Sequence, residues 1–140
     1  MKRLITPYLL QFALAAAVLA VIFRYFLSYG MDSRTAVIIH LSGVLYFAGM
    51  FISGWHFGKK DGNYLPIYDV GFRFHFTAYF VHNLISELWF ILGFNSCAEA
   101  IKFIHFTAII WGIFVLFHFL FFLRARKKSY NNLDKQDLFE

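Results

Sequence analysis

Four long apolar stretches, separated by short polar ones, set the strongest limit on what this chain can fold into. They cover residues 8–27, 36–57, 72–94 and 101–123, and each supplies the about 20 residues that a helix needs to cross a bilayer. Of the 140 residues, 60% are hydrophobic and only 15% are charged, which is too apolar for a soluble domain of this size. Backbone polar groups in hydrocarbon must bond within the chain, so apolar stretches cross as helices. The sequence therefore predicts an all-α integral membrane protein, a four-transmembrane-helix up-down bundle.

Residues that favour helix starts precede three of the four stretches. Thr6 is followed by proline, which is typical of an N-cap and the first helical position. Asp32 or Ser33 is expected to cap the second stretch. Ser96 and Glu99 have capping-box spacing, so we expect them to begin the fourth.

Basic residues are divided unequally between the two ends of the predicted bundle. With the N-terminus in the cytoplasm, the inner side holds Lys2, Arg3, Lys59, Lys60, Arg73, Arg124, Arg126, Lys127, Lys128 and Lys135, and the outer side holds Arg24, Arg34 and Lys102. This bias predicts that both termini are cytoplasmic, in a bacterial inner membrane. Residues 1–123 are then the membrane domain and residues 124–140 a basic, then polar, cytoplasmic tail. The net charge of +5 is thereby explained by topology, so the expected partner of the basic cluster is the lipid bilayer and not a nucleic acid.

Six histidines carry most of the chemical information, because ionisable groups inside a membrane are costly and usually functional. A rise of about 1.5 Å per residue sorts them by depth. The outer layer holds His40 and His105, the middle holds His82, and the inner layer holds His56, His75 and His118. The segments 39–46 and 104–111 also align, with histidine second and an aromatic residue last in each. If this alignment reflects a duplication, His40 and His105 face each other.

Neutral imidazole is the usual axial ligand of haem iron, so facing histidines predict bis-histidine haem. His105 and His118 are 13 positions apart, and in this spacing the chain resembles the membrane b-type cytochromes, where two histidines 13 or 14 positions apart on one helix serve an outer and an inner haem. The resemblance implies haem b and the transfer of electrons across the bilayer between a quinone and a partner redox subunit. Any enzymatic activity would be that of an oxidoreductase subunit. His40 and His56 are 16 apart and depart from the pattern, which leaves the inner partner of His118 open between His56 and His75.

The third stretch has a polar and aromatic stripe at helical spacing. The stripe consists of His75, Tyr79, His82, Ser86 and Trp89. Such a stripe suits a proton relay or a quinone head group. A proton or ion path would use His82, Glu87 and Arg24, although Glu87 and Arg24 are equally suited to a buried pair that fixes helix register.

Two other function classes remain open. One is a small proton or transition-metal transporter or channel that uses the intramembrane His and Glu residues. The other is a non-catalytic subunit or assembly factor of a larger membrane complex. A single cysteine, Cys97, excludes an internal disulfide, and no HExxH or phosphate-binding glycine motif occurs.

Overall fold

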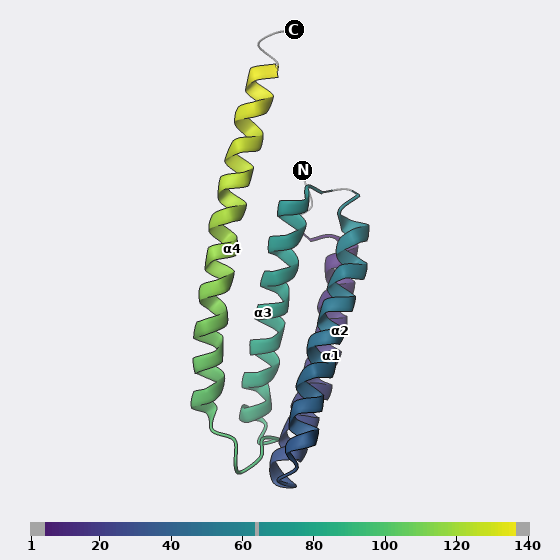
Figure 1. Cartoon of the computed structure of the whole chain (residues 1–140), viewed down its shortest axis with the longest axis vertical. Coiled ribbons are helices and arrows are strands. Elements are labelled where there is room, and N and C mark those ends of the chain that lie inside the picture. Colours follow the sequence, from purple (N-terminus) through teal and green to yellow (C-terminus); the bar gives the residue numbers. More distant parts are fainter. Residues whose placement is uncertain (1–4, 64, 137–140) are drawn as a thin grey trace.

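The computed structural model describes residues 5–63 and 65–136, with side chains up to residue 128, and all secondary structure in these ranges is helical. There are four helices, α1 (Pro7–Asp32), α2 (Ala36–Asp61), α3 (Ile67–Ile91) and α4 (Ile101–Gln136). Consecutive helices run in opposite directions, so the start of α1 and the end of α4 lie at the same end of the molecule (Figure 1). This confirms the all-α class and the up-down order of four helices.

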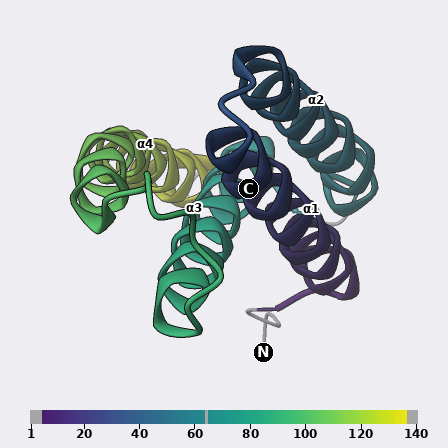
Figure 2. The ribbon, with the colours of Figure 1, turned by 90° about the horizontal axis from the view of Figure 1, so that it is seen from below.

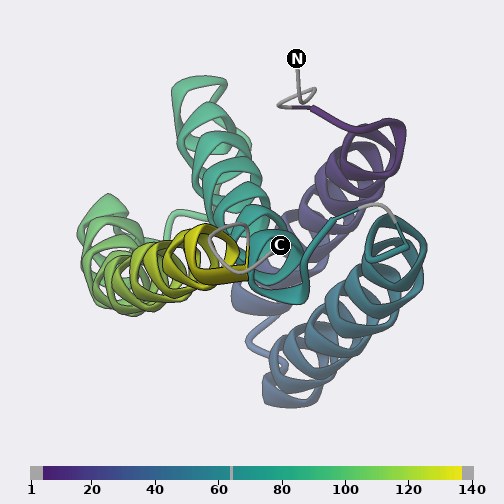
Figure 3. The same cartoon turned by 90° about the horizontal axis from the view of Figure 1, so that it is seen from above.

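The bundle is open and not closed. Helix α1 packs against α2 and α3, while α4, within the described residues, packs against α3 alone. The end-on views show α3 between the α1–α2 pair and α4 (Figures 2 and 3). The second and fourth helices therefore do not face each other, as they would if the aligned segments 39–46 and 104–111 reflected a duplication.

One face of α1 supplies most of the core. Its buried residues follow steps of three and four, which place them on one stripe, and they are Leu9, Phe12, Ala16, Ala20, Arg24 and Ser28. Ala16 and Ala20 are almost completely buried, because small side chains let helices approach closely in an apolar setting. Phe12 packs against Phe74 of α3 with ring centroids 4.8 Å apart.

Three of the helices, α1, α2 and α4, are long and apolar enough to cross a membrane. Large apolar side chains on them are exposed, among them Phe47 at 74% and Trp55 at 69%. These features are compatible with an integral membrane protein. Helix α3 is not among these three, and along its length it carries Asp69, Arg73, His75, His82, Asn83 and Glu87.

The helix starts agree in part with expectation. Thr6 is the N-cap of α1, as predicted, and its hydroxyl accepts from the amide of Leu9 at 3.1 Å. The same hydroxyl donates to the buried Asp61 at 3.0 Å, which joins the start of α1 to the end of α2.

The other two predicted caps are placed differently. Thr35, and not Asp32 or Ser33, is the N-cap of α2, because α1 continues to Asp32. Ser96 and Glu99 do form a turn, with the amide of Ala98 donating to Ser96 Oγ at 3.1 Å and the amide of Ser96 donating to Glu99 Oε1 at 3.4 Å. The helix nevertheless begins later, at Ile101.

Helix α4 is much longer than its apolar stretch. It has 36 residues and continues through the basic run 124–128 to Gln136, a length of about 54 Å. The boundary expected near residue 124 is thus a change in composition within one helix. The remaining tail residues, 137–140, lie outside the described residues.

The close approach of α1 and α2 at Gly30 gives a prediction for stability. A Cβ on Gly30 would lie 2.9 Å from Cγ1 and 3.2 Å from the backbone nitrogen of Ile39. We expect Gly30→Ala to lower the free energy of unfolding in detergent by about 1–3 kcal/mol, measured by denaturant titration with circular dichroism. Gly43→Ala is the matched control, since a Cβ there meets nothing within 4 Å. Equal stability of the two variants would contradict the close packing at Gly30.

Candidate functional site

His75 lies at the centre of a chain of hydrogen bonds between α3 and α4. Trp111 Nε1 donates to His75 Nε2 at 2.8 Å, and His75 Nδ1 lies 3.0 Å from His118 Nδ1. Indole nitrogen is only a donor, so Nε2 of a neutral His75 accepts and its proton resides on Nδ1. His75 therefore donates to His118, whose own proton resides on Nε2. The chain runs in one direction, from Trp111 through His75 to His118.

A second polar contact joins α2 to α3 beside this chain. The hydroxyl of Tyr46 and Nδ1 of His82 are hydrogen-bonded at 2.9 Å. The His82 ring also lies against Trp111, with centroids 5.3 Å apart, and Phe23 of α1 stacks on Tyr46 at 4.7 Å. Trp111 thus contacts both histidines of α3. We call the five side chains of Tyr46, His75, His82, Trp111 and His118 the His–Trp cluster.

The cluster lies beside a groove that has α2 on one side, α4 on the other, and α3 between them. The groove has a volume of about 640 Å³, which is within the range of small-molecule sites. Its polar lining comes from Tyr46, His75 and Trp111. The rest of the lining is apolar and consists of Phe12, Phe47, Met50, Phe51, Gly54, Trp55, Phe74 and Ala78. We call this space the α2–α4 groove.

Arg24 belongs to a separate buried network near the other end of the helices. Its Nη2 donates to Glu99 Oε2 at 2.6 Å, and the two side chains are only 6% and 5% exposed. Ser28 donates to the other carboxylate oxygen of Glu99 at 2.5 Å, and Trp89 Nε1 donates to Ser28 at 3.1 Å. This network ties α1 and α3 to the loop that precedes α4.

The pairing of Arg24 with Glu87 is therefore wrong. Glu87 instead pairs with His105, with Oε1 and Nε2 3.0 Å apart. This pair is much more exposed, at 37% for Glu87 and 56% for His105. Glu87, His82 and Arg24 each bind a different partner, so they form no continuous path in this structure.

His40 and His56 are both exposed on α2. His40 Nδ1 is 2.7 Å from the carbonyl oxygen of Ala36 in its own helix, so Nδ1 donates there. His56 is exposed and meets the edge of its neighbour Phe57, with ring centroids 5.3 Å apart. His40 and His105 cannot face each other, because α2 and α4 make no contact within the described part of the chain.

These positions do not fit a bis-histidine haem. Such a haem needs one imidazole nitrogen on each side of the porphyrin, whereas His75 and His118 are in direct hydrogen-bond contact at 3.0 Å. That distance leaves no room for iron and its macrocycle. Among residues 5–63 and 65–136, no group of three His, Cys, Asp or Glu side chains is arranged to hold a metal ion.

Sequence reasoning missed Tyr46, Trp111 and Glu99 as site residues. Tyr46 and Trp111 are the last residues of the two aligned segments 39–46 and 104–111, and this matching position is the signal that points to them. Glu99 has no comparable signal, because its contact with Arg24 depends on the course of a loop.

Comparisons with known proteins give no relative for this chain: no family model, no curated protein and no solved structure matches it.

The buried ion pair gives a second prediction. We expect Glu99→Gln to lower the free energy of unfolding in detergent by about 3 kcal/mol, because it leaves the Arg24 guanidinium buried without a counter-charge. The matched control is Glu87→Gln, whose exposed pair should cost less than about 1 kcal/mol. The double variant Arg24→Met with Glu99→Leu should recover most of the loss. Equal losses for Glu99→Gln and Glu87→Gln would contradict the structural role of the Arg24–Glu99 pair.

Proposed function

We propose that all four helices cross a membrane, with the start of α1 and the end of α4 in the cytoplasm. Helix α3 has 25 residues, about 37 Å, which is long enough to span. Its central histidines bond to α4 and α2, so their polarity is satisfied within the protein. The basic run 124–128 follows the apolar part of α4, as expected of a cytoplasmic boundary.

Cys97 offers a direct test of this topology. It is the only cysteine, it is exposed, and it lies in the loop between α3 and α4. A membrane-impermeant maleimide added to intact cells or spheroplasts should label it, and Cys97→Ser should abolish the labelling. If Cys97 is labelled only after the membrane is lysed, the loop between α3 and α4 is cytoplasmic and the proposed topology is inverted.

The function supported best is that of a quinone-binding subunit in membrane electron transfer. The observation that carries this proposal is the α2–α4 groove, an apolar and aromatic space of about 640 Å³ with Tyr46, His75 and Trp111 along it. It lies between two helices that do not meet, so a lipophilic ring can enter from the bilayer. Aromatic walls suit a planar ring, and a few polar groups suit its oxygens.

The histidines beside the groove can accept and pass on protons that are released when a quinol is oxidised. Oxidation of a quinol releases two electrons and two protons, and the His75–His118 contact offers a route for one proton at a time. A proton taken up at Nε2 of His75, in place of the Trp111 hydrogen bond, allows the Nδ1 proton to pass to His118 Nδ1, and His118 then releases its Nε2 proton. His118 Nδ1 is 3.0 Å from His75 Nδ1, and His118 follows Trp111 on α4 in the direction of the proposed cytoplasmic side. Proton transfer would therefore follow the direction of the hydrogen-bonded chain.

The two electrons go to a partner redox subunit in this proposal. Helix α4 has room for such a partner, since it contacts α3 alone among the described residues. Phe114, Phe117 and Phe121 are exposed on it at 56–65%. Aromatic side chains of this kind are common at protein interfaces.

Quinone binding gives the test of function. Trp55 and Trp111 line the α2–α4 groove, so titration of the purified protein with decylubiquinone in detergent should quench tryptophan fluorescence to saturation. We expect Gly54→Leu to weaken binding about tenfold, because the added side chain fills the groove. Gly43→Leu is the matched control on the same helix, in open space, and should bind like the wild type.

Two outcomes would overturn the proposal. One is linear quenching that is the same in all three proteins, which indicates collisions with quinone dissolved in the micelle. The other is a reduced-minus-oxidised spectrum with Soret and α-bands from the purified protein, lost in His105→Ala and His118→Ala. That spectrum would support the bis-histidine haem expected from the sequence in place of the groove.

A further inference from the structure

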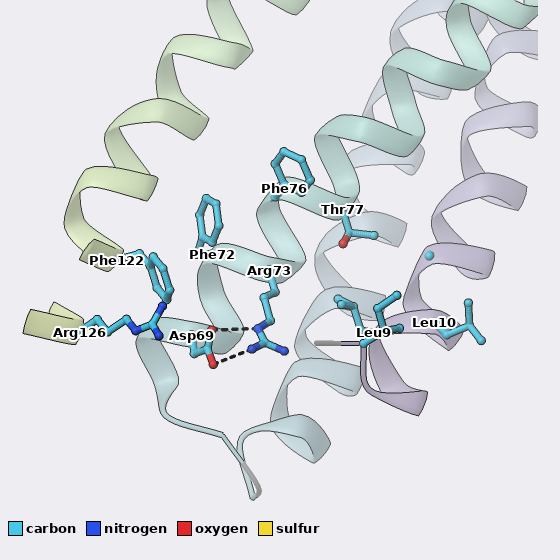
Figure 4. Close-up of a pocket in the computed structure, with 11 residues that line it drawn as sticks. Leu9, Leu10, Asp69, Phe72, Arg73, Phe76, Thr77, Phe122 and Arg126 are labelled. Carbon is cyan, nitrogen blue, oxygen red and sulfur yellow. Dashed lines mark hydrogen bonds and ion pairs between the residues drawn. The ribbon is translucent and has the colours of Figure 1, made fainter. Parts of the chain in front are cut away.

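A second groove lies on the other flank of α3, between α1 and α4, which also make no contact in the described residues (Figure 4). Its volume is about 530 Å³. We call it the α1–α4 groove. It is separate from the α2–α4 groove, with no lining residue in common, and depends only on the proposed membrane topology.

The walls of the α1–α4 groove are apolar along most of their length. Leu9, Leu10 and Ala13 form the α1 side. On the opposite side, Phe72 of α3 stacks on Phe122 of α4, with ring centroids 5.1 Å apart and planes at 20°. Phe76 lies next to Phe72 on the α3 wall, with ring centroids 6.0 Å apart. This lining suits a hydrocarbon chain.

Charged groups collect at one end of this groove. Arg73 donates to Asp69 through two hydrogen bonds, from Nε to Oδ1 at 2.9 Å and from Nη2 to Oδ2 at 3.0 Å. The guanidinium of Arg126 comes from α4 on the other side of Asp69 (Figure 4). Among the described residues that line the groove, the charged ones are these two arginines and one aspartate. Guanidinium groups match the geometry of phosphate oxygens.

In the proposed topology, the charged end lies at the depth of the membrane surface. Asp69 is in the first turn of α3, and Arg126 follows the point where the apolar part of α4 gives way to basic residues. From this end, the apolar walls lead toward the middle of the helices. We infer that the α1–α4 groove binds one anionic phospholipid of the cytoplasmic leaflet, with its phosphate at Arg73 and Arg126 and an acyl chain along Leu10, Ala13 and Phe76.

The test compares lipid retention in the full chain. Protein purified in detergent and stripped of lipid is mixed with dioleoyl phosphatidylglycerol or dioleoyl phosphatidylcholine, and bound lipid is counted by native mass spectrometry. We expect one retained phosphatidylglycerol, preferred about fivefold over phosphatidylcholine. Arg126→Gln should remove this preference. The matched control Arg124→Gln should keep it, because Arg124 has the same charge but does not line the groove. An excess of inorganic phosphate should not displace the lipid.

A second pair of variants tests the apolar walls without a change of charge. Ala13→Phe fills the groove and should reduce retention, whereas Leu14→Phe, at a residue that is 63% exposed, should not. Equal effects of Arg126→Gln and Arg124→Gln, displacement by inorganic phosphate alone, or unchanged retention in Ala13→Phe would each overturn the inference. None of these outcomes depends on quinone binding, so failure here is distinguishable from failure of the proposed function.

Discussion

Polar side chains inside an apolar helix assembly must bond to one another, and this constraint determines how α3 is held. Helix α3 carries His75 and His82, and two neighbouring helices provide their hydrogen-bond partners. Helix α4 provides Trp111 and His118 for His75, and α2 provides Tyr46 for His82. At the other end, Trp89 reaches Ser28 of α1. In hydrocarbon no water replaces these contacts. The helix that carries these histidines is therefore also the one that all the others touch.

The position of α4 follows from the same constraint and explains both grooves. Its contacts with α3 combine the His–Trp cluster with stacked phenylalanines such as Phe72 and Phe122. Because it touches neither α1 nor α2 in the described residues, a space remains on each flank of α3. The two spaces differ in chemistry: histidine, tyrosine and tryptophan line one, and arginine and aspartate close the end of the other.

The sequence predicts the helices well because apolar length and the Thr6 cap are local properties. The pairing of polar residues is less local. The sequence leaves two candidates, His56 and His75, for the inner partner of His118. The structure shows a hydrogen bond with His75, and the sequence does not give this choice because it depends on which helices are neighbours. Arg24 meets Glu99 and not Glu87 because the loop after α3 folds back over α1. Counting depth along each helix ranks candidates by height, but it gives neither the neighbours nor the path of the loop.

Because α4 is long, a small tilt of this helix displaces its end by several ångströms. The 18 residues that follow His118, up to Gln136, extend the helix by about 27 Å. A tilt of about 10° at the His75–His118 contact would displace the end of the helix by about 5 Å. A small rearrangement around two imidazole rings would thus become a displacement of several ångströms at the end of α4.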